Sequence, residues 1–101
     1  MKFWSSWWKK SKGSVPPTIY YVAGDGSDRL DGKHPLRAWR TIEHLNQHKH
    51  KVRRDDQILF KRGFIYPGRP YYISSEKHLA LRVGAYGSGT HPVFPDVEKP
   101  K

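Results

Sequence analysis

The chain has 101 residues, no cysteine and a formal net charge of +10. This length allows one small domain, and the lack of thiols excludes disulfides, thiolate catalysis and cysteine-ligated zinc. The positive charge predicts attraction to polyanions, whether nucleic acid, anionic polysaccharide or acidic lipid, without selecting among them.

Residues 1–17 form a separate compositional unit that combines three tryptophans and four lysines with a Pro-Pro pair. We interpret it as a disordered cationic tail. The alternative is an anchor at a membrane interface, because Trp favours the headgroup layer and Lys favours anionic lipid. The apolar residues are too few and too interrupted for a recognisable signal peptide or a membrane span.

The first predicted element is a strand over residues 18–22, which are β-branched and aromatic. Residues 23–35 are rich in Gly and Asp and predict turns. A short helix follows over residues 41–48, with Ala38, Ile42 and Leu45 spaced to share one face. Thr41 is the expected N-cap, and Glu43 suits the positive end of the helix dipole.

The second half of the chain alternates between strand and turn patterns. After a basic run at residues 48–54, we expect strands at 57–61, 71–74 and 79–85, a loop at 62–70 and an extended segment at 92–94. The strand centres lie about 11 to 14 residues apart, a spacing that fits both a small antiparallel barrel and the faces of a solenoid.

Two clusters of ligand-type residues are weak candidates for metal sites. The loop that holds Asp25, Asp28 and Asp31 does not match a calcium loop, since a cationic Arg29 occupies a ligand position, so we expect these carboxylates to bond their own turns. His44 and His48 have a zinc-chelating spacing without further ligands nearby, so we expect a solvated helix face. No metal or cofactor is predicted.

Residues for catalysis are equally sparse. The side chains of Asp55 and Asp56 are adjacent and should diverge, and the chain carries no nucleophile elbow or phosphate loop. A basic and aromatic group is the better candidate for a binding site, since Arg binds carboxylate or phosphate and aromatic rings stack on sugars or bases. Its predicted members are Lys61, Arg62, Tyr66 and Arg69, with Tyr71 and Tyr72 in the following strand.

Four phrases occur in a distinctive order: GSDRLDG at residues 26–32, WRTIEHLN at 39–46, DQILFKRG at 56–63 and GAYGSG at 84–89. Together they resemble the N-terminal capping region of right-handed parallel β-helix proteins of the pectate-lyase-like superfamily. Many of these are exported polysaccharide lyases, hydrolases or epimerases. The resemblance implies a mainly β fold with one short helix. A cap and about one rung would span residues 18–95, with disordered tails at 1–17 and 96–101.

The resemblance also assigns structural roles. Residues 20–22 would form the first strand, and Ile58 and Phe60 would begin the first rung. Trp39 and Asn46, with the apolar helix residues, would seat the helix over the open end of the solenoid. The chain departs from the family at Asp55, where Gly is common, and no position matches a catalytic motif. One rung is too short for a complete solenoid, so we expect a truncated chain that self-associates through its exposed edge.

The resulting functional hypothesis is a non-catalytic cap segment of a protein that acts on or binds polysaccharide, with an anionic polysaccharide favoured by the charge. The alternative is a self-contained small β-barrel or α+β module that binds nucleic acid through residues 49–54 and the aromatic residues. A weaker alternative is a cationic protein at a membrane interface. The resemblance suggests export, whereas the sequence shows no export signal.

Overall fold

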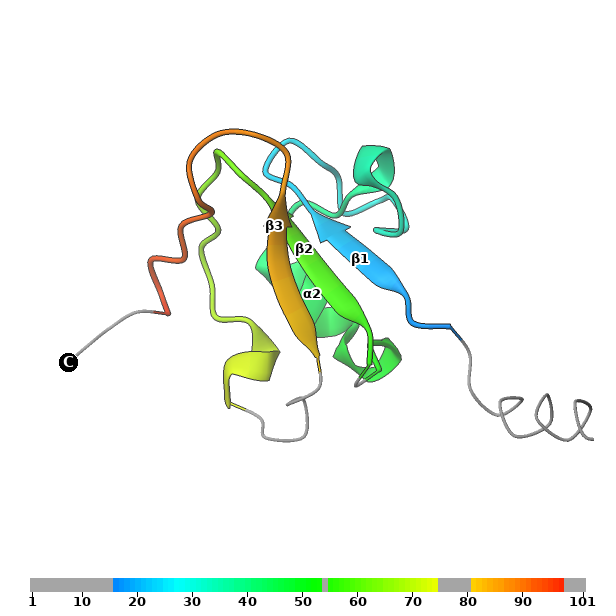
Figure 1. Ribbon diagram of the computed structural model, residues 1–101. Coiled ribbons are helices and arrows are strands. Elements are labelled where there is room, and N and C mark those ends of the chain that lie inside the picture. Colours follow the sequence, from blue (N-terminus) through cyan, green and yellow to red (C-terminus); the bar gives the residue numbers. More distant parts are fainter. Residues whose placement is uncertain (1–15, 54, 75–80, 98–101) are drawn as a thin grey trace, which may run out of the picture.

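The computed structural model describes residues 16–53, 55–74 and 81–97. Strands β1 (Ile19–Val22), β2 (Gln57–Lys61) and β3 (Arg82–Tyr86) form a parallel sheet in the order β1-β2-β3 (Figure 1). The helices are α2 (Ile42–Gln47) and the 3-10 turns η1 (Pro35–Arg37), η2 (Lys49–Lys51) and η3 (Tyr71–Ser74). The fold is therefore mainly β with one short α-helix, as predicted. None of the described helices is long and apolar enough to cross a membrane.

The strands stack in parallel register, and the later part of the chain does so at similar sequence offsets. Ile19 pairs with Gln57, and Gln57 pairs with Arg82, 25 positions later. Outside the sheet, Ile65 forms a parallel bridge with Val93, 28 positions later. Two parallel contacts with similar offsets mean that the chain coils back over itself, which is compatible with part of a β-helix cap. The alternative prediction of a small antiparallel barrel is wrong, because every pairing in the described sheet is parallel.

The core lies between the sheet and α2, which runs behind the strands in Figure 1. Alternate residues of β1 and β2 point inward, as the two-residue period of a strand requires. The helix contributes Ile42 and Leu45, each at most 1% exposed. Burial of each such side chain stabilises the fold by about 1.5–3 kcal/mol. The strand residues of this core are Tyr20, Val22, Ile58 and Phe60.

The free edge of β1 is covered by the loop that follows it. The Tyr21 N–H donates to the Gly32 carbonyl at 2.7 Å, and the Trp39 N–H donates to the Tyr21 carbonyl at 2.9 Å. The Trp39 indole donates to the Leu30 carbonyl at 2.9 Å, which holds the ring over the turn. Gly32 has a φ of 73°, and a Cβ there would lie 2.5 Å from the Trp39 ring. The loop that holds Gly32 and Trp39 thus covers this edge of the sheet.

Asp28 anchors the start of α2. Its carboxylate accepts from the N–H groups of Arg40 at 2.7 Å and Thr41 at 3.0 Å, and from the Thr41 hydroxyl at 2.8 Å. Thr41 is the N-cap, as predicted, and accepts from the His44 N–H. Burial raises the pKa of Asp28, but these hydrogen bonds outweigh it and leave the pKa below its usual value. The expectation that this aspartate bonds its own turn was wrong, since its partners lie 12 and 13 positions away.

The predicted strand at residues 71–74 is a 3-10 turn. The Pro70 carbonyl accepts from the Ile73 N–H, and the Tyr71 N–H donates to the Asn46 side chain at 2.9 Å instead of joining a strand ladder. Strand propensity is overridden because the helix supplies a partner for this backbone. β3 begins at Arg82, later than predicted, although residues 79 and 80 lie outside the described part.

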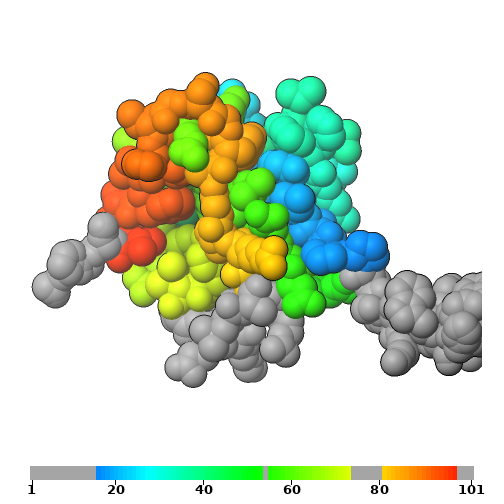
Figure 2. Space-filling view, viewed as in Figure 1, coloured from blue at the N-terminus to red at the C-terminus, as the bar shows by residue number. Residues whose placement is uncertain are grey.

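The opposite edge of the sheet is open. No described strand follows β3. Val83 of β3 pairs with the buried Ile58, yet it is 45% exposed. Ile65 and Val93 are 63% and 47% exposed on the neighbouring face. Figure 2 shows β3 at the surface of the molecule, beside β2. The sheet therefore has one closed edge and one apolar open edge. Most of the predicted tails, residues 1–15 and 98–101, lie outside the described residues.

Candidate functional site

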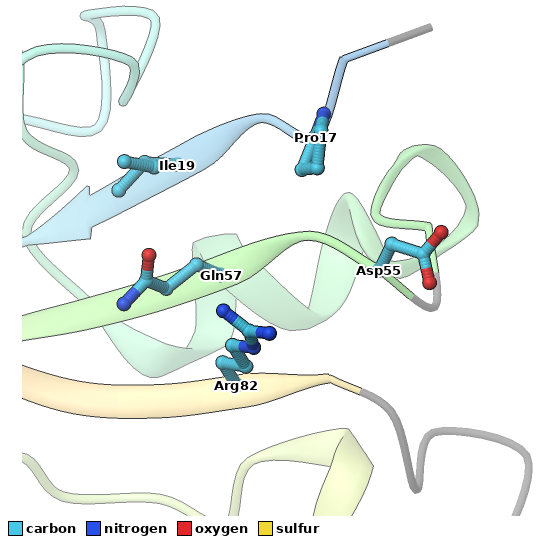
Figure 3. Close-up of a pocket in the computed structure, with 5 residues that line it drawn as sticks. All are labelled: Pro17, Ile19, Asp55, Gln57 and Arg82. Atoms are coloured by element: carbon cyan, nitrogen blue, oxygen red, sulfur yellow. The ribbon is translucent and has the colours of Figure 1, made fainter. Parts of the chain in front are cut away.

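A cleft opens on the outer face of the sheet where its three strands begin (Figure 3). Its volume of about 460 Å³ falls within the range of small-molecule sites. The residues that line it are Pro17, Ile19, Asp55, Gln57 and Arg82. One strand or its leading turn contributes each of them.

Parallel register brings these residues together. Ile19, Gln57 and Arg82 occupy the same rung position in three neighbouring strands. Ile19 and Gln57 point away from the core, because the residues after them, Tyr20 and Ile58, are buried. Arg82 is exposed and lies in register with Gln57. Figure 3 shows the Arg82 side chain extending from β3 toward Gln57, with Asp55 apart from this pair, before the start of β2. The cleft is thus built by backbone pairing.

Asp55 and Asp56 diverge, as predicted, and have different roles. Asp56 is 1% exposed and accepts from the N–H groups of Thr18 at 2.9 Å and Arg53 at 2.8 Å. It ties the start of β1 to the turn before β2. Asp55 is exposed and faces the cleft. Of the two, only the Asp55 carboxylate is exposed to a ligand.

The cleft is equipped to form hydrogen bonds. The Asp55 carboxylate only accepts, the Arg82 guanidinium only donates, and the Gln57 amide does both. None of these three side chains has a hydrogen bond or ion pair to another residue in the described ranges. Pro17 and Ile19 add apolar walls. This arrangement can bind a polar molecule but contains no nucleophile paired with a base.

Tyr66 requires a correction to the predicted binding group. It is 1% exposed, and its hydroxyl donates to the Lys61 carbonyl at 2.7 Å and accepts from the Gly24 N–H at 3.3 Å. Burial raises its pKa to about 12. Its ring packs against Phe60 and Phe94 in the core and cannot stack on a ligand.

The three cations of that group are not brought together. Lys61 ends β2 and its ammonium lies 3.1 Å from a carboxylate oxygen of Asp25. Arg62 follows it, and its N–H donates to the Tyr86 carbonyl. The loop then runs back toward η3 in Figure 1, where the Arg69 carbonyl accepts from Asn46. Binding by these cations stays a prediction, without a shared pocket to support it.

The two helix histidines are partly buried, which corrects the expected solvated face. The rings of His44 and His48 lie 4.4 Å apart, and their centroids are 5.1 and 5.0 Å from that of Trp39. Desolvation lowers the pKa of His44 below its usual value; the nearby Asp28 charge opposes this shift and His48 adds to it. Within the described residues, no three His, Cys, Asp or Glu side chains form a group that could hold a metal ion.

Sequence reasoning missed the cleft. The sequence predicts Gln57 and Arg82 only as strand residues and assigns no ligand to Asp55. Polar residues do begin β2 and β3, but only the parallel register shows that they share one surface.

The sequence matches no known family model. It matches no curated protein either. Among solved structures, the fold is similar to the crystal structure of a GH136 lacto-N-biosidase from Eubacterium ramulus, with a TM-score of 0.56 and 22% sequence identity. The similarity covers 90% of this chain and 14% of that enzyme, so this chain corresponds to a small part of it. At this identity, the likeness shows the fold alone.

Proposed function

We propose that this chain forms the cap and first turn of a parallel β-helix in a carbohydrate-related protein, and that the segment itself is non-catalytic. The observation that carries the proposal is the pair of parallel contacts, Gln57 with Arg82 and Ile65 with Val93, at offsets of 25 and 28 residues. A closed edge at β1 and an open apolar edge at β3 are what a cap requires, since it ends a sheet on one side and continues it on the other.

The carbohydrate connection is supported by the structural similarity to a segment of a lacto-N-biosidase. The absence of a paired nucleophile and base in the cleft supports a binding role. The strong positive charge adds affinity for acidic polysaccharides through the exposed cations of the surface.

Affinity electrophoresis tests this function. The chain is run in gels that contain soluble neutral or acidic polysaccharides, and the same polysaccharides are assayed for released reducing ends and unsaturated products. We expect retardation by at least one polysaccharide without product release. Product release would refute the non-catalytic role.

Duplex and single-stranded DNA serve as the competing ligands. We expect any DNA binding to weaken steeply with salt and to show no preference for base or strand, as charge alone predicts. DNA binding with a preference for base or strand, without polysaccharide retardation, would contradict the carbohydrate assignment and favour the nucleic-acid module.

A further inference from the structure

We propose that the cleft lined by Asp55, Gln57 and Arg82 is a binding subsite for a neutral, hydroxyl-rich saccharide unit, in contrast to the acidic ligand that the net charge favours. The inference rests on the proposed carbohydrate function and names the chemical class of ligand for one site.

The local charge carries the first step. The chain as a whole has a formal net charge of +10, whereas the cleft contains one carboxylate and one guanidinium. The formal charges of these two lining residues sum to zero, and the long-range positive field is screened beyond about 8–10 Å at moderate salt. A carboxylate on the ligand would be attracted by Arg82 and repelled by Asp55. A neutral ligand avoids this opposition.

The hydrogen-bonding capacity carries the second step. A sugar hydroxyl both donates and accepts, so a pair of hydroxyls can donate to Asp55 while another accepts from Arg82. Gln57 pairs with Arg82 in the sheet register and can serve either role. None of the three side chains has a hydrogen bond or ion pair within the described ranges, so binding breaks no bond among the described residues. Hydrogen bonds to charged groups are stronger than those between neutral groups.

The shape of the cleft carries the third step. Pro17 and Ile19 form one wall on the β1 side, where the apolar face of a sugar ring can rest. The volume of about 460 Å³ is near the lower end of the range for small-molecule sites, which favours a short saccharide unit over a large ligand.

The test uses pairs of disaccharides that differ only at C6. They are α-1,4-galactobiose with digalacturonate, and β-1,4-mannobiose with dimannuronate. Each is titrated at millimolar concentrations into the ¹⁵N-labelled chain, and backbone amide shifts are followed by NMR at low and moderate salt. We expect at least one neutral disaccharide to shift the Ile19, Gln57 and Arg82 amides with an affinity that salt does not change. The acidic partners are expected to bind more weakly there and to lose their shifts with salt.

Asp55→Asn is the decisive variant, with Glu43→Gln as a control that removes the same charge from an exposed position on α2. Loss of a charged acceptor should weaken neutral-sugar binding about tenfold. The cleft then has a net positive charge, so the acidic disaccharide should gain affinity. The control should change neither.

Two results would overturn the inference: no cleft shifts with either neutral disaccharide, or tighter binding of the acidic partner to the unaltered cleft. If polysaccharide retards the chain while the cleft amides stay unperturbed, the subsite is refuted and the carbohydrate function remains. If polysaccharide does not retard the chain and the cleft amides do not shift, the subsite and the carbohydrate function are both refuted.

Discussion

Replacement of Asp56 by Asn is expected to destabilise the fold far more than its position beside an exposed aspartate suggests. The carboxylate is 1% exposed, and each of its oxygens accepts one backbone N–H, from Thr18 and from Arg53. Asn has nearly the same shape but only one oxygen. Its amide group would therefore point an N–H at one of the two backbone donors.

The expected loss follows from these two bonds. A hydrogen bond to a charged group contributes about 1.5–3 kcal/mol, and Asp56→Asn removes one such bond and makes the other neutral. We expect the free energy of unfolding to fall by about 2–4 kcal/mol. A domain of this size has about 5–15 kcal/mol in total, so the variant would approach the limit of stability.

Urea unfolding followed by circular dichroism measures the loss, with Asp55→Asn as the matched control. The neighbouring side chain is exposed and has no described partner, so its replacement should alter the free energy of unfolding by no more than about 0.5 kcal/mol. Equal unfolding midpoints for the two variants would refute the reasoning. Hydrogen exchange should further show faster opening at Gln57, whose N–H donates to the Thr18 carbonyl.

Three further predictions concern the loop after β1 and helix α2. Gly32→Ala should lower the free energy of unfolding by about 1–3 kcal/mol more than Gly63→Ala. Both glycines have positive φ, but only at Gly32 would a Cβ lie against the Trp39 ring. Equal losses in urea unfolding would contradict this packing. The fold lowers the pKa of Asp28 below 3.8, so the ionised carboxylate stabilises the fold above that pH, and this stabilisation is lost as pH falls through the folded pKa. The difference in Tm between the parent chain and Asp28→Asn should therefore shrink in acid. The fold also lowers the pKa of His44 below 6.5, so stability should fall as pH drops through 6.5, and His44→Gln should flatten the Tm profile between pH 7 and 5.

Local sequence signals predicted the elements whose determinants lie close together in the chain. The helix occupies Ile42–Gln47 with Thr41 as its N-cap, and β2 has the predicted bounds Gln57–Lys61. Apolar periodicity and capping chemistry act within a few residues, so they can be recognised without tertiary contacts. The structure places Trp39 over the edge of β1, and the cap role that the ordered phrases imply stays a prediction.

The errors fall where distant segments compete for the same groups. Residues 71–74 have strand-type composition, but Asn46 takes the Tyr71 N–H and the segment turns. Tyr66 was predicted to belong to a binding surface, but its ring packs against Phe60 and Phe94 and is buried. Asp28 bonds across 12 and 13 positions, a distance that turn propensities do not cover.

The sequence by itself determined that this chain is a small, cysteine-free and strongly basic domain of mainly β structure with one capped helix, because composition and short-range periodicity fix those properties. The tertiary structure decided which residues share a surface. Parallel pairing placed Ile19, Gln57 and Arg82 side by side although they are 38 and 25 positions apart, and it left the edge of β3 open. The physical reason is that backbone hydrogen bonds set the register between strands, and only that register brings together the side chains of the cleft.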